Sequence, residues 1–99
     1  MAMFHVVLRR SGPDWDASLP LEAQSGWMEH AAFMDGLVQD GFLDLGEPLA
    51  DEQRVVHAVE AVSEEAVRRT LARDPWSGTH LVAETVEPWT IRLDGRRID

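Results

Sequence analysis

Residues 51–76, DEQRVVHAVEAVSEEAVRRTLARDPW, decide the fold of this chain. The first part, Asp51–Val62, carries apolar side chains on both faces of an alternating pattern, which predicts a long strand. Ser63 is a good helix N-cap, and the two glutamates after it fall in the first turn, where the helix dipole favours acidic groups. The helix is predicted to run to about Arg73, because Asp74-Pro75 disfavours further helix. A strand is therefore followed directly by a helix.

The chain before this stretch is also predicted to contain strands and one helix. Before residue 51 the chain is predicted to form a strand over Met3–Arg10, a loop over Ser11–Pro20, a helix over about Glu22–Asp40, a strand over Phe42–Leu45 and a turn at Gly46-Glu47-Pro48. The helix is indicated by apolar residues at helical spacing. Gly41 stands where a C-terminal glycine cap belongs.

The chain after residue 76 adds a last strand. Thr79–Val86 is predicted to be extended, and Glu87-Pro88 is predicted to interrupt it. Trp89–Leu93 is expected to continue as an edge strand, and the polar tail, residues 94–99, is expected to be mobile.

The predicted order is strand, helix, strand, strand, helix, strand. This is the split βαβ, or ferredoxin-like, arrangement, an α+β fold with an antiparallel sheet in one domain. Two helices cover only one face of such a sheet, and the other face here still carries apolar side chains. We therefore expect a homodimer in which a second copy packs sheet to sheet around a barrel-like interior.

The composition excludes several classes of protein. The chain has 18 acidic and 9 basic side chains and a formal net charge of −9, whereas nucleic-acid binding needs clustered Lys and Arg. It has no cysteine, which excludes disulfides and a cysteine nucleophile. No apolar run approaches a membrane span, and the apolar start is too short for a signal peptide. We expect a cytoplasmic protein with neither nucleic-acid nor membrane partners.

One pair of side chains is a candidate acid/base site. His30 lies on the apolar stripe of the first predicted helix, one turn from Trp27 and from Met34. It is either a core histidine bonded to a backbone carbonyl or a functional imidazole. Asp74 is either a helix stop or the partner of His30, because the ends of two helices on one sheet face can approach each other. As a pair, the carboxylate would orient the ring, and the ring would move a proton to or from a substrate.

The remaining histidines suggest an alternative site. His5, His57 and His80 fall on predicted strands, with Glu84 close to them. Such nitrogen and oxygen ligands suit zinc or a similar ion. No HxH or HExxH spacing supports a metal site, and scattered sheet histidines are the simpler interpretation. Glycine-rich phosphate loops and dinucleotide fingerprints are also missing, so we expect neither a metal nor a cofactor.

Short motifs follow one another along the whole chain: Trp27-Met28-Glu29-His30, Phe33-Met34, Gly41, Gly46-Glu47-Pro48-Leu49, Ser63-Glu64-Glu65-Ala66, Asp74-Pro75-Trp76 and Glu87-Pro88-Trp89. In this order and spacing they resemble the YCII-related domain family. One departure is Glu47, where many members have a glycine directly before the proline.

The resemblance implies a single YCII-like domain over residues 1–99 that pairs into a dimeric α+β barrel. It also implies a pocket in each subunit with a histidine–aspartate dyad, whose positions carry over to His30 and Asp74. Similar domains include a dehydrochlorinase of chlorinated aromatics, and the wider barrel superfamily includes lactone isomerases and cofactor-free monooxygenases.

Two functions remain open at this point. The first is a cofactor-free enzyme that uses His30 and Asp74 for elimination, isomerisation or hydrolysis of a small cyclic or aromatic molecule. The second is a non-catalytic dimer that binds a small molecule or regulates, in which the same two residues are binding or structural groups.

Overall fold

The computed structural model describes residues 1–95 and not residues 96–99. Its elements in chain order are β1 (Ala2–Arg9), the short 3-10 helix η1 (Leu21–Ala23), α1 (Trp27–Gln39), β2 (Leu43–Pro48), β3 (Arg54–Ala61), α2 (Glu64–Leu71) and β4 (Val82–Pro88). The predicted ferredoxin-like order βαββαβ is therefore confirmed. The prediction for the tail lies largely outside the described residues.

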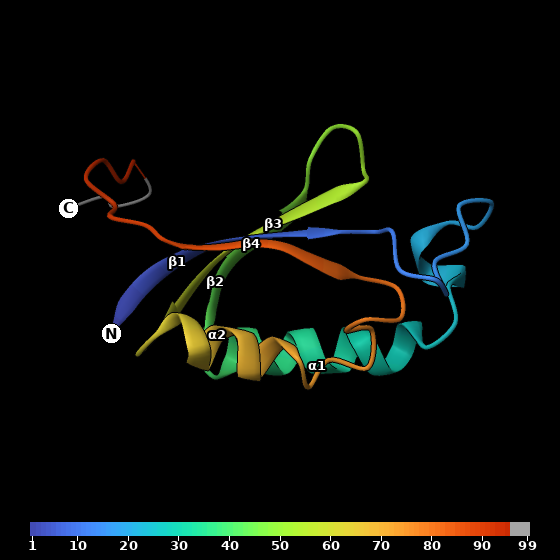
Figure 1. The fold of residues 1–99 in the computed structure, drawn as a ribbon, viewed down its shortest axis with the longest axis horizontal. Helices are drawn as coiled ribbons and strands as arrows, with labels where there is room; N and C mark the ends of the chain where they lie inside the picture. The colour runs from blue at the N-terminus through green and yellow to red at the C-terminus, as the bar shows by residue number, and fades with distance from the viewer. Residues whose placement is uncertain (96–99) are drawn as a thin grey trace.

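The four strands form one antiparallel sheet in the order β2-β3-β1-β4. Both helices lie on the same face of the sheet, and the β2–β3 turn and the chain after β4 lie toward the other side (Figure 1). In the centre of the sheet, Val6 of β1 stands opposite His57 of β3 and Val86 of β4. This register places all three side chains on the helix-covered face.

The core lies between the sheet and the helices. Alternation along β1 sends Phe4, Val6 and Leu8 into it, and all three are buried. Trp76, in the turn after α2, and Val67 of α2 are almost completely buried against them. Burial of each large side chain stabilises the fold by about 1.5–3 kcal/mol, so this layer provides most of the driving force.

Local sequence explains where the helices begin and end. The Ser63 hydroxyl accepts a hydrogen bond from the Ala66 N–H, which confirms the predicted cap of α2. Gly41 has a φ of 78°, the left-handed conformation expected of a glycine after the end of α1. Within residues 1–95, neither helix is long and apolar enough to cross a bilayer.

The first helix begins at Trp27, later than the expected Glu22. The reason is Gln24, whose buried side chain accepts from the Asp16 N–H at 2.9 Å and donates to the Asp16 carbonyl at 2.6 Å. These bonds tie the start of the predicted helix to the preceding loop. Gly26 then takes a left-handed φ of 71°, which separates the loop from the helix.

Prolines end two strands at places where turns were predicted. Pro48 is the last residue of β2, and Pro88 is the last residue of β4. Both strands are edges of the sheet, where proline is tolerated because one side of the strand makes no ladder hydrogen bonds. The predicted interruption at Glu87-Pro88 is therefore wrong, since these residues pair with His5 and Phe4.

The last strand is displaced from its predicted position. Residues 79–81, expected to be extended, each donate a backbone N–H to the Trp76 carbonyl, so β4 begins only at Val82. Residues Trp89–Leu93 were expected to form an edge strand, but the structure has no strand there. The Trp89 N–H donates to the Met3 carbonyl at 2.9 Å, and regular pairing ends there. β3 and α2 are each shorter than predicted.

Candidate active site

His30 and Asp74 are in direct contact. His30 of α1 is buried, and its Nδ1 lies 2.9 and 2.8 Å from the two carboxylate oxygens of Asp74, which is also buried. An ionised carboxylate only accepts hydrogen bonds, so the imidazole proton of this bond sits on Nδ1. The neutral ring therefore presents a lone pair on Nε2. The two residues chosen from the sequence are thus brought together across 44 positions of the chain.

The turn after α2 fixes the Asp74 carboxylate. The Asp74 N–H donates to the Leu71 carbonyl, which closes the end of α2. Asp74 Oδ1 also accepts from the Trp76 N–H at 2.9 Å. Aspartate favours such bonds to a backbone N–H two residues on, and this is the local reason for Asp-Pro-Trp at this place. The helix stop and the partner of His30 are therefore the same residue, and the two interpretations do not exclude each other.

Trp76 packs against the imidazole of His30. The two rings stack with centroids 4.1 Å apart and an interplanar angle of 6°. Trp76 also stacks with His80 at 4.6 Å and 15°, and its Nε1–H donates to the Ser25 carbonyl at 2.9 Å. Trp15 approaches its indole edge-on at 5.9 Å. This aromatic cluster leaves the His30 ring little freedom to turn, which holds its Nε2 in one direction.

His80 has partners on both ring nitrogens. Its Nε2 lies 2.9 Å from the Ser25 hydroxyl, and its Nδ1 lies 3.0 Å from the Thr79 hydroxyl. His80 is buried, so these bonds meet the need of a buried imidazole for partners. We therefore assign it a structural role beside Trp76.

His57 differs from both of these histidines. It is only 5% exposed, and its Nδ1 is the sole buried side-chain nitrogen or oxygen of the described residues without a hydrogen-bond partner. Burial first, and then the charge of His30, lowers the pKa of His57 to about 4, against an opposing effect of Asp74. From the sequence, this residue was interpreted either as a metal ligand or, more simply, as a scattered sheet histidine. The alternation of His57 with Val55 and Val59 on one face of the strand was the sequence signal that this histidine is buried.

The alternative metal site is not assembled. His5 lies on the opposite sheet face from His57 and packs edge-on against Trp89 at 5.2 Å. Both ring nitrogens of His80 already lie beside hydroxyl groups, and Glu84 forms an ion pair with Arg9 at 3.2 Å. Within residues 1–95, no three His, Asp or Glu side chains are grouped to hold a metal ion.

A cavity of about 140 Å³, here called the His30 cavity, borders both His30 and His57. Its other lining residues are mostly apolar or aromatic and include Arg10, Leu21, Trp27, Met34, Val55 and Trp76. Ligand sites in proteins commonly combine such apolar walls with a few polar groups. The cavity gives a small ring-shaped molecule a place next to the two imidazoles.

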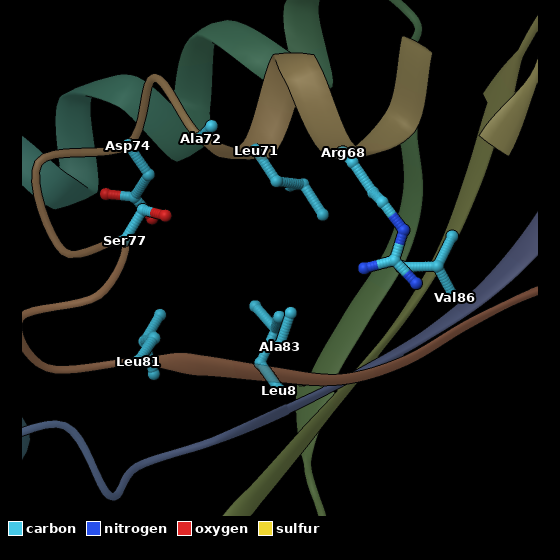
Figure 2. A pocket seen from close by; sticks show the side chains of 9 residues that line it. All are labelled: Leu8, Arg68, Leu71, Ala72, Asp74, Ser77, Leu81, Ala83 and Val86. Atoms are coloured by element: carbon cyan, nitrogen blue, oxygen red, sulfur yellow. The ribbon is translucent and has the colours of Figure 1, made fainter. Parts of the chain in front are cut away.

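A second cavity of about 160 Å³ lies between α2 and β4 and is called the α2–β4 cavity (Figure 2). Asp74 and Ser77 lie at one end of it and Arg68 at the other, with apolar side chains such as Leu71 and Ala83 between them. His30 does not line it. The imidazole of the pair therefore borders the His30 cavity, and the carboxylate borders the α2–β4 cavity.

Searches for matching family models, curated proteins and solved structures found no match to this chain. The resemblance to YCII-related domains therefore stays a prediction that rests on the motifs alone. Its one departure, Glu47, lies in β2, and the side chain of Glu47 is not among those described.

Proposed function

We propose that this protein is a cofactor-free enzyme that uses His30 and Asp74 for acid/base chemistry on a small cyclic or aromatic molecule. The observation that supports this most is the buried bond from His30 Nδ1 to both oxygens of Asp74. It orients the ring and leaves Nε2 as the proton-accepting atom. Aromatic walls beside that ring favour a flat substrate.

The chemical step is a proton transfer at His30 Nε2. His30 takes a proton from the substrate or from water. In an isomerisation it returns the proton to another atom of the same molecule, and in a hydrolysis it gives the proton to the leaving group. In an elimination the leaving group departs with its bonding electrons, a double bond forms, and the proton passes from His30 to water. Asp74 stabilises the imidazolium that forms in between. Elimination, isomerisation and hydrolysis all use such a step, and the site supports these classes equally. We place the activity in the cytoplasm.

Turnover tests this proposal. The wild-type protein is assayed with unsaturated lactones, chlorinated aromatic compounds and 4-nitrophenyl acetate. For the substrate that is turned over, His30→Ala is expected to lower kcat by at least a hundredfold, in the range for loss of a general base. His5→Gln, a histidine on the other sheet face, serves as the matched control. A fully active His30→Ala protein would refute the role of His30.

Binding without conversion is the other outcome of the same assay. A compound that saturates the protein and gives no product on prolonged incubation would replace the enzyme proposal by the ligand-binding alternative. Asp74→Asn separates a functional pair from a merely local contact. Long-range ¹H–¹⁵N NMR is expected to show the proton of neutral His30 on Nδ1 in the wild type and a mixed tautomer in Asp74→Asn.

We further propose that two copies pair through the sheet face that the helices leave open. Apolar side chains stand on or beside this face, including the half-buried Met3, Val7 and Val56 and the exposed Leu45 and Trp89. Analytical ultracentrifugation of the wild type is expected to give a dimer, and Val7→Asp a monomer. A wild type that sediments as a monomer would refute the pairing.

A further inference from the structure

His57 is the one functional group of the site that the acid/base pair does not use. It lies on β3, on the sheet face under the helices, and borders the His30 cavity. None of the described residues makes a hydrogen bond to either of its ring nitrogens. A buried ring nitrogen without a partner, such as Nδ1 of His57, is uncommon, because leaving one unsatisfied costs about 1–3 kcal/mol.

The close approach of Gly46 to the His57 ring indicates which ring nitrogen carries the proton. This residue of β2 is paired with His57 across the strands, and a Cβ added to it would collide with His57 Nδ1. The Cα of Gly46 therefore packs directly against that nitrogen, and none of the described residues makes a hydrogen bond to it. An N–H at Nδ1 would be both crowded and unpaired. The proton is accordingly on Nε2, on the far side of the ring from Nδ1.

His30 and His57 divide two tasks between them. His30 has the Asp74 carboxylate to compensate a positive charge, whereas His57 has no carboxylate in contact. Burial lowers the pKa of His57 to about 4, so this ring is neutral at pH 7. One imidazole is a base, and the other is a neutral hydrogen-bond donor. Enzymes that remove a proton next to a carbonyl pair a base, often a carboxylate, with a neutral hydrogen-bond donor of this kind.

We propose that His57 is a second substrate-contacting residue, whose Nε2–H donates to a carbonyl oxygen of the substrate in the His30 cavity. This inference rests on the proposed function and narrows the substrate to a carbonyl compound with a C–H next to the carbonyl group. In the step, the C–H bond breaks and its proton goes to His30 Nε2. The electron pair of that bond forms a C=C bond, the π pair of the C=O bond moves to oxygen, and His57 Nε2–H donates to the resulting enolate oxygen.

The first experiment determines the tautomer of His57 in the full-length free protein. Long-range ¹H–¹⁵N spectra between pH 5.5 and 8 are expected to show a neutral ring with the proton on Nε2 throughout. A proton on Nδ1, or a charged ring at pH 7, would overturn the proposal. His57→Gln assigns the signals, because it removes one imidazole and keeps a side chain that can still donate.

The second experiment measures whether the site prefers a carbonyl oxygen. Acetophenone and ethylbenzene have closely similar shapes, and only acetophenone carries the acceptor. The wild type is expected to bind acetophenone about tenfold more tightly, the effect of one hydrogen bond. His57→Gln is expected to keep part of this preference, and His57→Leu to lose it. Circular dichroism confirms that both variants are folded.

Two results would refute the role of His57. One is a wild type with no preference for acetophenone, which includes the case in which neither compound binds. The other is a preference that persists in a folded His57→Leu protein. The measurement needs no turnover, so it is separate from the test of His30. If His30→Ala keeps full activity while the carbonyl preference depends on His57, the proton step fails and the His57 contact stands.

Discussion

The surroundings of Trp76 and the face of β3 both bury histidines, and they treat them differently. Around Trp76, the ring nitrogens of His80 and the Nδ1 of His30 all have oxygen partners. On β3, His57 is equally buried and has none. The comparison teaches that burial alone does not define the role of a histidine. The hydrogen-bond partners of the ring nitrogens are what distinguish these buried histidines.

The difference has a structural cause. The neighbourhood of Trp76 is built from helix ends and turns, whose serine, threonine and aspartate side chains supply oxygen atoms. The β3 neighbourhood is built from strands, in which the backbone groups are already used by the sheet, and the facing residue is Gly46. On this face of β3, none of the described residues therefore offers Nδ1 of His57 a hydrogen-bond partner.

The largest expected effect on stability comes from truncating Trp76, because this removes the centre of the aromatic cluster. Trp76→Ala removes the ring against which His30 and His80 stack and is expected to lower the free energy of unfolding by about 3–5 kcal/mol. Trp89→Ala, at a tryptophan that is 42% exposed, is the matched control and is expected to have a much smaller effect. Urea denaturation measures both. Equal losses of unfolding free energy in the two variants would show that the cluster around Trp76 stabilises the fold no more than the exposed Trp89 does.

Acid sharpens the comparison, because burial lowers the pKa of His57 from 6.5 to about 4. Below pH 6.5 the unfolded chain binds a proton that the folded chain does not, so stability falls as the pH falls toward 4. The slope is expected to be about 1.4 kcal/mol per pH unit within this window. Unfolding free energies at pH 7 and pH 5 measure it. His57→Gln should show a clearly flatter dependence, whereas His5→Gln should match the wild type.

Two glycines give the smallest and most local test. Gly46→Ala introduces a methyl group against His57 and is expected to cost about 1–3 kcal/mol, the range for overpacking. Gly36 is inside α1 with open space around its Cα, so Gly36→Ala should stabilise by up to about 1 kcal/mol. Thermal unfolding compares the two. A neutral Gly46→Ala with unchanged His57 signals would contradict the close approach of Gly46 to that ring.

Much of the fold could be predicted from patterns in the sequence. Alternation in β1 and β3, the Ser63 cap and the Gly41 terminus each act over a few residues, so a local pattern contains them. The wrong boundaries have non-local causes. Gln24 bonds to a distant part of its loop, and the prolines were tolerated because their strands became sheet edges, which no local pattern reveals.

The same contrast between local patterns and non-local contacts applies to the candidate site. The sequence by itself determined that His30 lies on an apolar helix face and that Asp74 ends the second helix, because both facts depend on spacing and turn chemistry. Only the tertiary structure decided that they meet, that Trp76 stacks beside them and that His57 is left without a partner. Contacts between residues tens of positions apart depend on how the helices cross the sheet and on strand register, and a one-residue slip of β3 would turn His57 to the other face.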